Sequence, residues 1–89
     1  MDLHHVGLAV SDLYAQELFF RKVLGFSTSY RYLSRNTPGL RTVFLERGPA
    51  RVELLQREGF EPPASPGHLA FEVADVDAEH ERLERLGVA

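Results

Sequence analysis

Two histidines and one glutamate occupy positions from which they could bind a metal ion. His5 and His68 each begin an apolar stretch with strand character, and Glu53 lies inside a third such stretch, RVELLQ. Neutral imidazole and carboxylate groups are ligands for Fe(II), Mn, Co, Ni and Zn, and three of them leave positions open for water or substrate. If the three strands come together, these residues predict a site for a divalent metal.

Strand geometry places these residues where a ligand has room. Because alternate residues of a strand share a face, His5 lies on the same face as the small residues Gly7 and Ala9. Glu53 and His68 likewise lie opposite the apolar faces of their strands. Polar groups that project among small neighbours are typical of a concave ligand-binding surface. The alternative is that both histidines are half-buried strand residues and that Glu53 is a solvated edge charge.

Other polar and aromatic residues are weaker candidates for chemistry. We expect His4 on the Val6 face or in a frayed terminus, and His80 on the exposed side of a helix. Tyr30 and Tyr32 precede a loop and either line a pocket or have structural roles. The sequence has no serine in a nucleophile-elbow context and no glycine-rich phosphate loop.

The pattern of apolar residues predicts which elements position these side chains. A strand and a helix are followed by three strands, a proline-rich extended linker, and a second strand and helix. In chain order the predicted elements are residues 3–10, 13–24, 26–33, 42–46 and 51–56, the linker at about 58–67, and residues 68–73 and 77–86. The first helix is expected to begin at an N-cap of Ser11 or Asp12 and to end at Gly25.

An internal repeat defines the organisation of the chain. HVGLAVSDLYA and HLAFEVADVDA align at an offset of 63 residues. The identical pairs are His5/His68, Val10/Val73, Asp12/Asp75 and Ala15/Ala78. We therefore predict a single α+β domain over residues 1–89, with one complete module at about 1–57 and the start of another at 68–89. The remaining strands of the second module are expected either in a segment absent from this sequence or in another chain.

Composition narrows the class of protein. The chain has 89 residues, of which 44% are hydrophobic and 26% are charged, and it has no cysteine. These values predict one soluble domain and exclude disulfides, thiolate metal sites and cysteine nucleophiles. A net charge of -3 with scattered arginines argues against nucleic acid as a partner, and no apolar stretch is long enough to cross a membrane. We expect a cytoplasmic protein.

Three blocks of the sequence together resemble a known superfamily. They are HHVGLAVSDLYAQELFFRKVLGF, RVELLQ and GHLAFEVADVDAEHERLERLGV, in this order. The chain resembles the vicinal oxygen chelate superfamily, which comprises glyoxalase, bleomycin resistance and extradiol dioxygenase proteins. The resemblance implies a pair of βαβββ modules that curve into a cleft around a divalent metal, commonly completed by dimerisation.

The resemblance also implies roles for particular residues. The metal ligands of the superfamily match His5, Glu53 and His68, so the implied cofactor is a divalent ion of Fe, Mn, Ni, Co or Zn. Glu53 is then also the expected catalytic residue, since the resemblance implies that either a metal-bound water or a ligand carboxylate moves the proton. The fourth ligand of the superfamily, a glutamate in the last strand of the second module, has no counterpart in this sequence.

Two functions follow from the resemblance. The first is a metal-dependent lyase, isomerase or dioxygenase whose small substrate chelates the metal through vicinal oxygens. The second is a metal-free protein that sequesters a drug or another small molecule, as bleomycin resistance proteins do. Both imply a small-molecule ligand and a homodimer, with neither nucleic acid nor membrane as a partner. Stoichiometric metal supports the first function, and tight ligand binding without metal supports the second.

Overall fold

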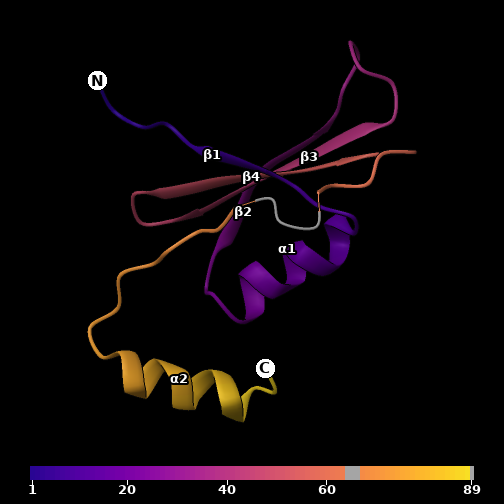
Figure 1. Cartoon of the computed structure of the whole chain (residues 1–89). Helices are drawn as coiled ribbons and strands as arrows, with labels where there is room; N and C mark the ends of the chain where they lie inside the picture. The colour runs from indigo at the N-terminus through magenta and orange to yellow at the C-terminus, as the bar shows by residue number, and fades with distance from the viewer. Residues whose placement is uncertain (64–66, 89) are drawn as a thin grey trace.

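The computed structural model describes residues 1–63 and 67–88. These residues form a strand, a helix, three strands and a second helix (Figure 1). In chain order the elements are β1 (Val6–Ala9), α1 (Leu13–Lys22), β2 (Ser27–Leu33), β3 (Leu40–Arg47), β4 (Ala50–Arg57) and α2 (Val76–Arg85). The α+β class and the order of elements predicted for the first module are confirmed.

The four strands form one sheet in the order β1-β4-β3-β2. β1 is parallel to β4, whereas β3 is antiparallel to both β4 and β2. A parallel pair requires a long crossover connection, which α1 and the two intervening strands provide. β1 stands at one end of this order, so its outer edge has no neighbouring strand within residues 1–63 and 67–88.

α1 covers one face of the sheet and closes the hydrophobic core. Asp12 caps the helix by accepting a hydrogen bond from the backbone N–H of Ala15 at 3.1 Å. The buried core consists of Leu13, Phe20, Phe26, Val43, Leu45, Val52 and Leu54. The rings of Phe20 and Phe26 meet edge to face, with their centroids 5.3 Å apart. In Figure 1 the opposite face of the sheet carries no helix of the described chain.

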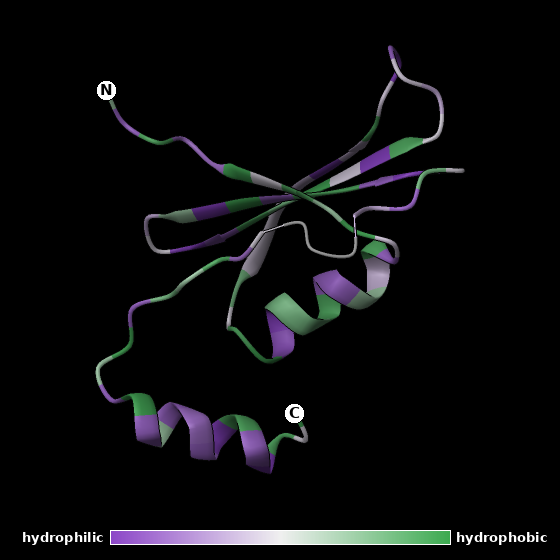
Figure 2. Cartoon of the chain, viewed as in Figure 1, coloured by the Kyte–Doolittle hydropathy of each residue, from purple (hydrophilic) through white to green (hydrophobic). Residues whose placement is uncertain are grey.

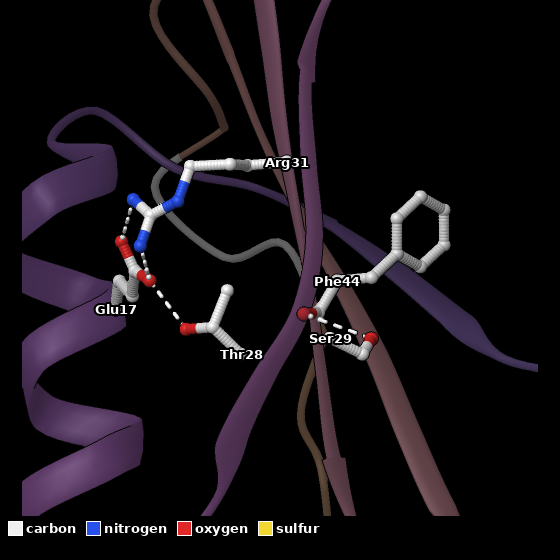
Figure 3. A network of polar contacts seen from close by, with 5 residues as sticks. All are labelled: Glu17, Thr28, Ser29, Arg31 and Phe44. Atoms are coloured by element: carbon white, nitrogen blue, oxygen red, sulfur yellow. Dashed lines mark hydrogen bonds and ion pairs between the residues drawn. The ribbon is translucent and has the colours of Figure 1, made fainter.

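A β-bulge at Ser29 determines which residues of β2 face α1. The pairing of β2 with β3 is interrupted between Thr28 and Tyr30, and the Ser29 hydroxyl donates a hydrogen bond to the Phe44 carbonyl at 3.3 Å (Figure 3). One extra residue reverses the alternation of side chains along a strand. Thr28 and Arg31 therefore both face α1, and Tyr30 faces the other side of the sheet.

The two side chains of β2 that face α1 bind the same buried carboxylate. Glu17 of α1 is only 4% exposed. Arg31 donates to both of its oxygens at 2.9 Å, and the Thr28 hydroxyl donates to Oε2 (Figure 3). A carboxylate is stable inside a protein only when it is paired and hydrogen bonded, and here both oxygens have partners. This network joins α1 to β2, the last strand of the sheet.

Thr42 on β3 carries a polar atom in an apolar setting. The residue is 1% exposed, and its hydroxyl has no hydrogen-bond partner among the described residues. Because an unpaired buried hydroxyl is destabilising, we expect Thr42→Val to raise the free energy of unfolding by about 1 kcal/mol. Urea denaturation measures this change. Thr42→Ser, which keeps the hydroxyl and loses a methyl group, should lower the same free energy; a loss of stability in Thr42→Val would contradict the expectation.

The segment predicted as the first strand of the second module forms no strand in the structure. Residues 68–73 have no hydrogen-bonded partner strand within the described chain, so the prediction of a strand here was wrong. A strand needs a neighbour to pair its backbone N–H and C=O groups. The segment instead makes apolar contacts: Leu69 packs against the core, and the ring of Phe71 lies 5.9 Å from that of Phe26.

The cap of α2 supports the internal repeat. Asp75 accepts a hydrogen bond from the backbone N–H of Ala78 at 3.1 Å, as Asp12 does from Ala15. These are two of the identical pairs that align at the offset of 63 residues. The two copies thus begin their helices with the same capping interaction.

α2 differs from α1 because it packs against no strand of the described chain. None of its residues is buried, and it contacts no other helix or strand of the described chain. Figure 2 shows it largely hydrophilic, with a few hydrophobic bands. Val76 and Leu86, at its two ends, are 71% and 54% exposed.

A hydrogen bond from Arg82 lowers the pKa of the Glu79 carboxyl below its usual range. No described helix is long and apolar enough to span a membrane.

Candidate metal centre

One row of side chains runs across all four strands on the face opposite α1, which we call the open face. Tyr30 pairs with Phe44, Phe44 with Glu53, and Glu53 with Gly7. Residues paired in this way lie about 5 Å apart, so the row is continuous. Leu8, the neighbour of Gly7, packs against the core. The predicted alternation of β1, with Gly7 directed away from the core, is confirmed.

His5 and Glu53 meet at one end of this row. His5 Nε2 lies 3.4 Å from Glu53 Oε1, and their side chains are 33% and 14% exposed. The His5 ring stands edge to face against Phe44, with centroids 5.2 Å apart. Gly7 leaves space beside the carboxylate, since a Cβ atom at this position would lie 3.5 Å from Glu53 Oε1. The structure therefore brings together two of the three predicted metal ligands, from different ends of the first module.

His4 also lies beside this pair, contrary to the expectation that it would face the Val6 side or fray. Its Nδ1 is 2.8 Å from His5 Nδ1, so one ring donates a hydrogen bond and the other accepts it. The reason is that β1 begins only at Val6, and the alternation of a strand does not extend to the residues before it. His4 can orient the His5 ring through this bond, which leaves Nε2 directed toward Glu53.

His68 stands apart from His5 and Glu53. It is exposed, in the extended segment that precedes α2. Within residues 1–63 and 67–88, no three His, Asp or Glu side chains lie close enough together to hold a metal ion. The site that one chain presents in this conformation therefore contains the His5–Glu53 pair without a third protein ligand.

A shallow hollow of about 360 Å³ adjoins the row on the open face. Its walls include His4, Ser29, Tyr30, Phe44 and Arg51. Of the two roles considered for Tyr30, pocket lining is therefore confirmed. Phe44 was not singled out from the sequence, although its place between Val43 and Leu45 in the stretch TVFLE carried the signal. Alternation puts it on the face opposite those two buried residues.

The donor set fits part of a divalent metal site. One imidazole nitrogen and one carboxylate are donors that suit Fe, Mn, Co, Ni or Zn, and both side chains are partly exposed to solvent. Such a site needs at least one further protein ligand to resemble the common arrangement of two histidines and one carboxylate. The same two side chains also form an ordinary ion pair when His5 is protonated.

Comparison with known proteins identifies the family. The model of the Glyoxalase/Bleomycin resistance protein/Dioxygenase superfamily matches residues 2–89, and the chain belongs to this superfamily. The resemblance to the vicinal oxygen chelate proteins is thereby confirmed. No curated protein sequence matches the chain.

Solved structures share the fold over nearly the whole chain. SMU.1112c is 26% identical with a TM-score of 0.75, over 98% of this chain and 75% of that protein. The trypanothione-dependent glyoxalase I of Leishmania major is 22% identical with a TM-score of 0.79, over 98% and 67% of the two chains. The fosfomycin resistance protein FosX of Listeria monocytogenes, solved with Mn(II) and sulfate, is 21% identical with a TM-score of 0.71, over 97% and 71%. This chain therefore spans about two thirds of the length of glyoxalase I and of FosX, and it shares their fold over that part.

Proposed function

We propose that His5, Glu53 and His68 hold a divalent metal ion, and that the protein is an enzyme whose small substrate chelates this metal through vicinal oxygens. The reaction class is that of a lyase, an isomerase or a dioxygenase. The observation that supports the proposal is the 3.4 Å approach of His5 Nε2 to Glu53 Oε1 beside the space left by Gly7. The fold shared with Mn(II)-bound FosX is consistent with it.

We propose that His68 reaches this site from a second copy of the chain. Three features support a dimer: His68 is exposed, the outer edge of β1 has no neighbouring strand in the described chain, and α2 contacts no other described helix or strand. An open sheet edge and an exposed amphipathic helix are surfaces that proteins usually cover. A two-fold arrangement places each copy of the 68–85 segment against the other module and builds two equivalent sites.

Two residues of this chain, besides the other proposed ligands, would have distinct roles in the proposed reaction. A bound divalent ion supplies Lewis-acid polarisation of the substrate oxygens. Glu53 would move a proton, because it is the carboxylate of the pair and no side chain at Gly7 covers its Oε1 atom. His4 orients the imidazole of His5 through the 2.8 Å contact between their Nδ1 atoms, and so keeps Nε2 available as a ligand.

A second function is favoured by one specific observation. The described residues of a single chain bring only two metal ligands together, and the Phe44 ring, which stacks on Tyr32, lies against one of them, His5. A metal-free protein that sequesters a small molecule on the open face would need no third ligand. In that case the His5–Glu53 contact is an ion pair beside the binding surface.

Metal content distinguishes the two functions. Protein purified without a histidine tag and titrated with Fe(II), Mn, Co, Ni or Zn is expected to bind near-stoichiometric metal, measured by calorimetry and elemental mass spectrometry. His5→Ala, Glu53→Gln and His68→Ala should each lower metal affinity by at least about 100-fold, since each removes a direct ligand.

Matched controls use residues of the same types outside the site. His80→Ala, on exposed α2, and Glu58→Gln, in the exposed turn after β4, should leave metal affinity unchanged. A folded wild-type protein that binds none of these metals would overturn the proposal in favour of sequestration. Loss of affinity in His5→Ala and Glu53→Gln but not in His68→Ala would remove His68 from the ligand set.

A further inference from the structure

Four aromatic side chains form a continuous array on the open face. His5 meets Phe44 at 5.2 Å between ring centroids, Phe44 stacks on Tyr32 at 6.5 Å, and Tyr32 lies 5.8 Å from Tyr30. The Phe44 and Tyr32 rings are nearly parallel, with an angle of 20° between their planes. The array thus extends from the candidate metal centre on one side to β2 on the other. We call it the aromatic platform.

The platform is exposed although its members are large and partly apolar. Tyr30 is 61% exposed and Tyr32 is 39% exposed. The aromatic residues Phe20 and Phe26, on the other face, are buried in the core. Exposed aromatic side chains that gather in one place mark binding surfaces rather than the core of a domain.

The neighbourhood of the platform has the size and polarity of a small-molecule site. The hollow beside it, about 360 Å³, is within the range of ligand pockets. Polar groups lie near the platform. The His5–Glu53 pair lies at the His5 end of the platform, and Arg51 and Glu46 line the hollow. A few polar groups around an aromatic surface fix the orientation of a flat ligand and favour such a ligand over an aliphatic one.

We propose that the aromatic platform binds a planar aromatic ring of one or two fused rings, lying against Tyr30, Tyr32 and Phe44. This inference rests on the proposed function in one respect, because the bound ring lies next to the His5–Glu53 pair. Ring binding itself needs no metal. Tyr30 and Tyr32 are then specificity-determining residues that select flat molecules from saturated ones of equal size.

The bulge at Ser29 makes the platform possible. Without the extra residue, Thr28 and Tyr30 would lie on the same face of β2, and one of them would lose its partner. With it, Thr28 and Arg31 bind Glu17 on the α1 side (Figure 3), whereas Tyr30, which pairs with Phe44, lies on the open face. One strand thereby serves the stability of the domain on one face and ligand binding on the other.

The test compares two probes with the same carbon skeleton, one aromatic and planar and the other saturated and not planar. 2-Naphthol and trans-decahydro-2-naphthol have the same carbon skeleton and a single hydroxyl, so neither chelates a metal through vicinal oxygens. Titration of metal-free protein followed by NMR chemical shifts should give 2-naphthol about tenfold higher affinity, with the shifts located on the open face of β2 and β3.

Variants assign the preference to the platform. Tyr30→Leu/Tyr32→Leu should abolish the preference for 2-naphthol, and Tyr30→Phe/Tyr32→Phe, which keeps both rings, should retain it. Tyr14→Leu, at an exposed tyrosine of α1, is the control and should change nothing. Metal titration of each variant keeps this test separate from that of the metal centre, because loss of ring preference with unchanged metal affinity concerns the platform alone.

Two results would overturn the inference. One is equal affinity of the wild-type protein for the two probes. The other is a preference for 2-naphthol that survives in a folded Tyr30→Leu/Tyr32→Leu variant. If the oligomeric state of that variant, measured by sedimentation, also changes, the platform is covered by a second copy of the chain.

Discussion

Replacement of Arg31 by methionine should lower the free energy of unfolding by about 2–3 kcal/mol, although more than half of the Arg31 side chain is exposed. The reason lies in its partner. The Glu17 side chain is 5% exposed, so loss of the guanidinium leaves a buried carboxylate with only the Thr28 hydroxyl to stabilise it. The exposure of Arg31 places the effect below the range for a fully buried pair.

Replacement of the partner, Glu17, by methionine should lower the free energy of unfolding by a smaller amount. Glu17→Met removes the buried charge together with its desolvation cost, and Arg31 is then free to be hydrated. We expect a loss of about 1 kcal/mol, mostly from the Thr28 hydroxyl that has lost its acceptor. The double variant should resemble Glu17→Met, so the two substitutions are non-additive.

Urea denaturation of the wild type, both single variants and the double variant gives this cycle directly. Arg21→Met, at an exposed arginine of α1, controls for the loss of a positive charge on the domain. Equal losses in Arg31→Met and Glu17→Met, with additive behaviour in the double variant, would show that Glu17 is hydrated in solution and that the network does not join α1 to β2.

The local elements of the fold were predictable because their signals lie within short stretches of sequence. Asp12 and Asp75 each precede an apolar periodic segment and each caps a helix. The alternation of β1 and β4 placed Gly7 and Glu53 on the same face, and the structure pairs them directly. These features depend on neighbours two to four residues away, which a single sequence contains.

Features that depend on partners distant in the sequence were not predictable in the same way. The bulge at Ser29 follows from the register between β2 and β3, and nothing in FSTSYRYL distinguishes it from a regular strand. The stretch that begins at His68 has strand composition, yet it forms no strand in the described chain because no neighbouring strand pairs with it. A stretch of sequence has strand composition by itself, but it forms a strand only when its backbone hydrogen-bonds to a neighbouring strand.

The candidate site contains one part that the sequence predicts and one part that depends on a distant partner. His5 and Glu53 belong to β-strand neighbourhoods of one module, so alternation and topology bring them within 3.4 Å of each other. His68 belongs to the second copy of the repeat, and its position relative to the first copy depends on how two modules pack. The repeat identifies His68 as the equivalent of His5, but only a packing partner can bring it to Glu53.

Whether His68 comes from the same chain or from a second copy can be tested by mixing two variants that each lack one metal ligand. His5→Ala and His68→Ala each lack one ligand, so neither homodimer contains an intact site. When the two are unfolded, mixed in equal amounts and refolded, half of the dimers are mixed, and each mixed dimer has one complete site. We therefore expect metal binding to recover to about one quarter of the wild-type amount, measured by elemental mass spectrometry after removal of free metal.

A second mixture provides the control. His5→Ala and Glu53→Gln damage the same half of the site, so their mixed dimers contain no intact site and should recover no metal. Recovery in the first mixture alone would establish that His68 comes from the second copy of the chain. If neither mixture recovers metal while the wild-type protein binds it, then His68 reaches His5 and Glu53 within one chain, and the 68–85 segment must fold back across the open edge of β1 rather than exchange between copies.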